Sequence, residues 1–180
     1  MAFLFFLLLP NFNLASAAIT EIGPPMLGFH ENITAGGGSI IPLTKFILQG
    51  DGSNALNKIG VTLRASTTMT VLEQINVLAL YRESVSKPNF QPNEDIYMGG
   101  TFQLNPATST LYVLQPTGGY AVPSSNTEFY VVASTTGISN IVNGNAFDVQ
   151  MHANYASTSA GALGTALLSP SYKITLRKNV

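Results

Sequence analysis

Two histidines and a few carboxylates are the residues of this chain whose types could support acid–base or nucleophilic chemistry. His152 follows Asp148 by four positions, so on a strand the two side chains share one face. Val149 and Met151 would then occupy the opposite face, against a core. The polar face is expected to be a solvated sheet surface rather than part of a catalytic triad. His30 lies in an extended segment, which is a poor scaffold for catalysis, and the sequence predicts no catalytic residue.

The second candidate is the loop from Ser84 to Asp95, which contains adjacent carboxylates at Glu94 and Asp95. Adjacent carboxylates on a strand point to opposite faces, which does not favour a paired-carboxylate hydrolase. Calcium takes about six to eight oxygen ligands, several of them carboxylates, and Lys87 adds a positive charge to this loop. The chain has no cysteine, so it has neither a thiolate metal site nor a disulfide framework. The sequence predicts a solvated loop, no metal and no cofactor.

Asn32-Ile33-Thr34 matches the acceptor pattern for N-linked glycosylation. It lies in a predicted loop beside a run of glycines, where an oligosaccharide would have room. Sugar is also a candidate ligand, because the chain has seven tyrosines whose rings can pack against sugar, although it has no tryptophan. The sequence therefore leaves two hypotheses about sugar: glycans attached at Asn32, and a carbohydrate-binding role.

The elements that must position these residues are short β-strands separated by turns. Polar residues alternate with Ile59, Val61 and Leu63, which predicts a half-buried strand. The run Phe129–Ala133 is apolar on both faces, and Gly99-Gly100 predicts a bulge or break. About seven to nine strands with this spacing predict an all-β fold, an immunoglobulin-like or jelly-roll β-sandwich with an N-terminal extended arm. The other predicted strands cover residues 40–48, 75–81, 96–104, 110–114, 147–151 and 172–176.

Two stretches of the body are less regular. Ile75, Val77, Ala79 and Tyr81 are interpreted as one face of a strand. Residues 154–170 are rich in small side chains and are interpreted as a connection within one domain, which covers residues 39–180.

The N-terminus has the pattern of a secretory signal peptide. Met1–Leu9 is a continuous apolar run, and Leu14–Ala18 supplies a small-x-small cleavage site, with cleavage expected after Ala17. No lysine or arginine precedes the run, which departs from the usual pattern; an N-terminal core strand is the alternative. The run is too short to span a bilayer. Residues 1–17 therefore predict a secreted protein, extracellular or on the cell surface, with no membrane span.

The composition favours contact with other protein surfaces. Charged residues make up 9% of the chain and the net charge is −1, whereas an average soluble domain has roughly 25% charged residues. This charge gives no electrostatic footprint for nucleic acid. It also provides little repulsion between copies of the chain, so we expect a surface that packs against its neighbours.

Residues 18–38 form an apolar arm that ends in a glycine hinge. Pro24-Pro25 excludes helix and favours an extended backbone. An exposed apolar strand must be buried, either in its own sandwich or, by donor-strand complementation, in the groove of another subunit. Insertion into the groove of another subunit, repeated head to tail between copies of the chain, builds a filament. The expected assembly residues are Ile19, Ile22, Met26, Leu27 and Phe29, with the hinge at Gly36, Gly37 and Gly38.

A resemblance to a known type of module supports this interpretation. The stretches IPLTKFILQGDGSNALNKIGVTLR, INVLALYRES and SSNTEFYVVASTTG, followed by FDVQM, resemble a β-sandwich module of bacterial and archaeal extracellular proteins. The resemblance covers about residues 40–152 and consists of hydrophobic patterns. In many such modules the loop after the tyrosine strand is rich in aspartate, and the loop from Ser84 to Asp95 departs from that pattern.

Modules of this type occur as tandem surface domains and as subunits of donor-strand extracellular fibres, which are pilin-like or fimbrial. With a single domain and an export-like start, this chain looks more like a fibre subunit. The resemblance thus implies a structural protein that polymerises with copies of itself. A monomeric cell-surface adhesive or carbohydrate-binding module is the alternative.

Overall fold

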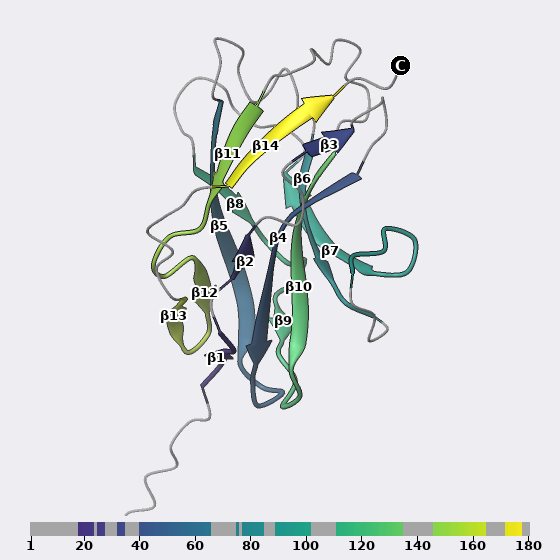
Figure 1. The fold of residues 1–180 in the computed structure, drawn as a ribbon. Helices are drawn as coiled ribbons and strands as arrows, with labels where there is room; N and C mark the ends of the chain where they lie inside the picture. The colour runs from purple at the N-terminus through teal and green to yellow at the C-terminus, as the bar shows by residue number, and fades with distance from the viewer. Residues whose placement is uncertain are drawn as a thin grey trace, which may run out of the picture.

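A computed structural model describes residues 18–23, 25–27, 32–34, 40–65, 75, 77–84, 89–101, 111–134, 146–164 and 172–177. The predicted signal peptide, residues 1–17, lies outside this described part. The described residues form two β-sheets that pack face to face (Figure 1). The predicted all-β, sandwich-like architecture is therefore confirmed.

The first sheet has six strands, and its path runs β1-β4-β10-β6-β7, with β2 also paired to β4. The central strand β10 carries the predicted run that is apolar on both faces. Phe129, Val131 and Ala133 face the core, whereas Tyr130 and Val132 are buried on the outer face. The strands of this sheet are β1 (Thr20–Glu21), β2 (Met26–Leu27), β4 (Ile40–Gln49), β6 (Val77–Arg82), β7 (Ile96–Thr101) and β10 (Thr127–Ser134).

The second sheet has eight strands and is organised around the long strand β5. Ile59 pairs with both Leu114 and Ala156, so β8 and β9 lie along one side of β5 while β11 and β12 lie along the other. Strands β13, β14 and β3 complete the sheet. Its strands are β3 (Asn32–Thr34), β5 (Ala55–Ala65), β8 (Leu111–Leu114), β9 (Tyr120–Ala121), β11 (Ala146–Gln150), β12 (Ala156–Thr158), β13 (Gly161–Leu163) and β14 (Tyr172–Arg177).

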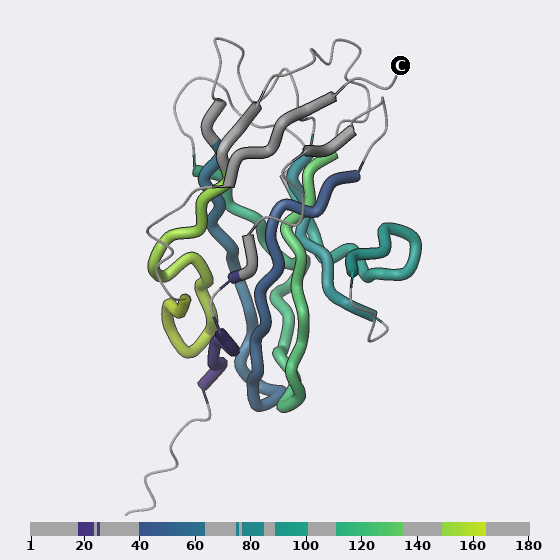
Figure 2. The backbone as a smooth tube through the Cα atoms, in the orientation of Figure 1, coloured from purple at the N-terminus to yellow at the C-terminus, as the bar shows by residue number. Residues whose placement is uncertain are grey.

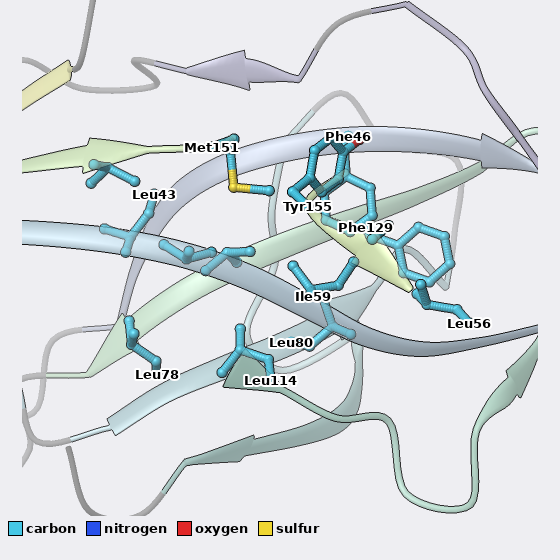
Figure 3. Packing of buried hydrophobic residues seen from close by; sticks show 14 of the residues in the cluster. Leu43, Phe46, Leu56, Ile59, Leu78, Leu80, Leu114, Phe129, Met151 and Tyr155 are labelled. Atoms are coloured by element: carbon cyan, nitrogen blue, oxygen red, sulfur yellow. The ribbon is translucent and has the colours of Figure 1, made fainter. Parts of the chain in front are cut away.

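The core lies between the sheets and contains the predicted inward-facing residues of β5, together with Val149 and Met151. At its centre, Phe46 of β4 stacks on Phe129 of β10, with ring centroids 5.2 Å apart. Tyr155 from the second sheet meets Phe46 edge-on at 5.5 Å (Figure 3). This aromatic cluster joins the two layers.

The residues interpreted as one face over 75–81 are divided in the structure: Ile75 belongs to the core, whereas other residues form the inward face of β6. Leu78 and Leu80 point into the core, whereas Tyr81 contacts Phe90 and Tyr97. Since nearly every position of this strand is apolar, alternation could not select the inner face. Phe90 also contacts Tyr130 at 5.4 Å, so residues around 90 lie on the outer face of the first sheet.

The bulge predicted at Gly99-Gly100 is confirmed. Leu80 pairs with Gly99 and Tyr81 pairs with Tyr97, so β7 has one extra residue opposite β6. Gly99 has a φ of 149°, and a Cβ atom there would collide with the carbonyl oxygen of Gln115. The glycine therefore lets β7 approach the chain that follows β8.

The connection predicted for residues 154–170 contains a hairpin within its described part, formed by β12 and β13. Thr158 closes this hairpin by donating a hydrogen bond from its hydroxyl to Gly161 O at 2.7 Å. Small side chains carry no alternating pattern, so the sequence did not indicate these strands.

Two turns meet at one end of the sandwich, which is the lower end in Figure 2. In the turn between β4 and β5, Asp51 accepts hydrogen bonds from the backbone amides of Ser53 and Asn54 at 2.8 Å. Gly52 N donates to Val122 O, which joins this turn to the one before β10.

Candidate functional site

The first part of the predicted arm, which contains β1 and β2, lies along the free edge of β4 in the first sheet (Figure 1). It pairs antiparallel with β4 at two places, through Glu21 opposite Leu48 and through Met26 opposite Lys45. Between them, Ile22 N donates a hydrogen bond to Ile47 O at 2.9 Å. Residues 20–27 thus follow β4 as an edge strand, and in a single chain the arm occupies its own sandwich.

The arm buries apolar side chains as well as backbone. Ile19 is 5% exposed and belongs to the core cluster, and Pro25 is also buried. Ile22 is half-buried, whereas Thr20 is exposed. Ile19 therefore inserts between the two sheets from the edge of the sandwich.

The structure covers only part of the other predicted assembly residues. The backbones of Met26 and Leu27 form β2, but their side chains lie outside the described part, as do Phe29 and the hinge Gly36, Gly37 and Gly38. The roles proposed for these residues stay predictions.

A polar contact that the sequence did not indicate connects the arm to the opposite sheet. The hydroxyl of Tyr155, just before β12, donates a hydrogen bond to Glu21 Oε1 at 2.5 Å. Burial, with the Glu21 carboxylate as a second cause, raises the pKa of Tyr155 far above its ordinary value of 10, so the phenol remains a donor. The two residues are separated by 134 positions, which no local pattern can relate.

We expect Tyr155→Phe to lower the free energy of unfolding by about 1–2 kcal/mol, because the partly buried carboxylate of Glu21 loses the hydrogen bond from this hydroxyl. Urea unfolding of Tyr155→Phe, Glu21→Ala and the double variant measures the coupling between the two side chains, expected at about 0.5–2 kcal/mol. Strictly additive effects would contradict a direct contribution of this hydrogen bond to the docking of the arm.

Asn32 lies in the short strand β3, opposite Thr175 of β14, rather than in the predicted loop. Strand β3 is the last strand on the path of the second sheet, so its other side is an edge. Glycosylation of Asn32 stays a prediction, because its side chain lies outside the described part.

Of the two histidines considered for catalysis, the structure describes His152. His152 is exposed, and its Nε2 lies 2.8 Å from Thr62 Oγ1. His30 and the side chain of Asp148 lie outside the described residues. Among the residues that the structure describes, no three His, Cys, Asp or Glu side chains gather as a metal site, and no helix is long and apolar enough to span a membrane.

The prediction of a solvated acidic loop is wrong for Asp95. This residue is buried, and its carboxylate accepts hydrogen bonds from Gln91 N at 2.7 Å and Ser84 N at 3.3 Å. It therefore fixes the backbone before β7, whereas its neighbour Glu94 is exposed. A sequence cannot distinguish a carboxylate that caps backbone amides from one that faces water.

Fold and site together define a two-sheet β-sandwich whose N-terminal residues form a separate edge strand. Neither the comparison with protein-family models nor the search of curated proteins finds a match for this chain.

Proposed function

We propose that this chain is a structural subunit of a secreted, extracellular filament. Polymerisation would transfer the arm from the subunit's own β4 edge to the β4 edge of the next subunit. In this proposal residues 1–17 are removed on export, and the body is a sandwich of the immunoglobulin-like or jelly-roll type, similar to pilin-like fibre modules. The observation that carries the proposal is the position of Ile19, a core residue supplied by a separable edge strand.

The contacts of the arm are of the kind that donor strands use. Backbone hydrogen bonds to β4 would provide affinity, and the buried Ile19 and Pro25 would provide specificity. An arm from a second chain would reproduce the same contacts, as in domain swapping. Exchange therefore replaces one set of contacts with an equivalent one.

The chain that joins the moving segment to β4 is short. Residues 35–39 separate β3 from β4, and five residues span at most about 18 Å when extended. The glycines at 36–38 follow β3, so movement at this hinge requires β3 to leave β14 together with the arm. The proposed transfer thus moves β1, β2 and β3 as one segment.

The repeated contact joins two different surfaces of the subunit. The arm of one subunit and the β4 edge of the next are different surfaces, so the interface is heterologous and extends as an open fibre unless the rotation closes a ring. The low charge of the chain, with 9% charged residues, adds little repulsion between successive subunits.

The test is electron microscopy and size-exclusion chromatography of the secreted protein, alongside two single variants of the arm. Ile19→Asp places a charge in the core position and should abolish fibres, while Thr20→Asp changes an exposed neighbour and should leave them intact. A wild-type protein that stays monomeric, or fibres that form equally well with Ile19→Asp, would overturn the proposal.

A further inference from the structure

A pocket of about 380 Å³ opens where β6 ends and β10 begins. Arg82, Glu83 and Ser84 form one wall, and residues 125–128 form another. Tyr120 of β9 lies at its inner side, so both sheets contribute. The pocket uses no arm residue, and its volume is within the range of about 300–1,000 Å³ that small-ligand sites occupy.

The Arg82 side chain packs against an aromatic ring in this pocket. Its guanidinium lies 5.2 Å from the centre of the Tyr120 ring, which itself packs edge-on against Phe129 at 5.9 Å. The Nε atom of Arg82 is buried, and no acceptor within the described residues is in hydrogen-bond range. A buried donor of this kind indicates an acceptor from outside those residues.

Two carboxylates of the pocket are fixed from the outer face of the first sheet. Glu128 Oε2 accepts a hydrogen bond from Lys45 Nζ at 2.8 Å. The hydroxyl of Tyr130 lies 3.0 Å from Glu83 Oε2 and 3.1 Å from Glu128 Oε2. Since a phenol has one proton to donate, Tyr130 donates to one of these two carboxylates at a time.

The charges in and beside the pocket cancel. Arg82 and Lys45 carry two positive charges, and Glu83 and Glu128 carry two negative charges. A strongly anionic ligand would meet the carboxylates, and a cation would meet the guanidinium. An apolar ligand would have to desolvate both kinds of group without hydrogen bonds.

We propose that this pocket binds a neutral sugar residue of a glycan. A sugar hydroxyl donates one hydrogen bond and accepts others, which matches a lining that includes both carboxylate acceptors and a guanidinium donor. Ser125, Asn126 and Thr127 add hydroxyl and amide groups along the wall. Because Arg82 covers a face of Tyr120, recognition is by hydrogen bonds to hydroxyls rather than by stacking on that face.

The proposal is tested by calorimetric titration of the full-length protein with neutral oligosaccharides, and in parallel with uronate- or sialate-containing ones. We expect saturable binding of a neutral sugar. Asn126→Ala should weaken it about fivefold, the effect of losing one hydrogen bond. Asn93→Ala, an exposed residue that does not line the pocket, should leave it unchanged.

Arg82→Gln removes the guanidinium and should reduce binding at least as much as Asn126→Ala, with folding monitored by circular dichroism. Absence of binding to every neutral sugar at millimolar concentration would overturn the proposal. Selective binding of acidic sugars, or neutral-sugar binding that Asn126→Ala leaves intact, would overturn it as well. Fibre formation is measured separately, so failure here leaves the filament proposal standing.

Discussion

A chain that lacks residues 18–27 should neither form fibres nor reach the stability of the complete protein. Removing the arm opens the core at Ile19, and truncating a single buried aliphatic side chain already costs about 2–5 kcal/mol. It also exposes the backbone of β4 along its edge. Against a typical total stability of about 5–15 kcal/mol, this loss is large. Thermal unfolding followed by circular dichroism measures it.

The same truncated chain allows a direct test of strand donation. A synthetic peptide of residues 18–27, added during refolding, should bind the vacated β4 edge and restore cooperative unfolding, even if the truncated chain alone does not fold. The matched control is the same peptide with Ile19→Asp, which should bind at least tenfold more weakly because it carries a charge into the core. Equal binding of the two peptides would show that Ile19 does not direct the arm into this groove.

Replacing Phe129 with alanine is expected to lower the free energy of unfolding by about 3–5 kcal/mol. The side chain is 0% exposed, stacks on Phe46 at 5.2 Å and meets Tyr120 at 5.9 Å. Its removal leaves a cavity between the sheets that the neighbouring strands can only partly fill. Urea denaturation monitored by circular dichroism gives the value.

The control for this variant is Leu111→Ala, since Leu111 is 50% exposed in β8. Its effect should stay within about 0.5 kcal/mol. If Phe129→Ala cost less than 1 kcal/mol, the aromatic contact between the layers would contribute little to the fold.

The sequence predicted the strands best where one face alone is apolar. Alternation at Ile59, Val61 and Leu63 indicated the inward face of β5, and the same held for Val149 and Met151. Alternation did not indicate the inward face of β6, because apolar residues occupy both faces of this strand. It also failed for β12 and β13, whose small side chains carry no periodicity.

The candidate site could be predicted only in part. The apolar, proline-containing arm indicated that Ile19 would be buried in a sandwich, and Ile19 belongs to the core cluster. Its polar counterpart, the contact between Glu21 and Tyr155, depends on how two sheets stack, which a linear pattern does not encode. The same applies to the pocket, where Arg82 and Glu128 come together only through the pairing of β6 with β10.

The parallel pairing of β3 with β14 has a consequence for the response of the subunit to tension. Asn32 to Thr34 runs in the same direction as Thr175 to Arg177, so a pull on the start of β3 and on the end of β14 acts along the strands in opposite directions. Their hydrogen bonds are then loaded together, in shear, rather than broken one after another. While β3 is paired with its own β14, force transmitted through the two ends of the chain would thus load this sheet edge in shear, which is visible beside β14 in Figure 1.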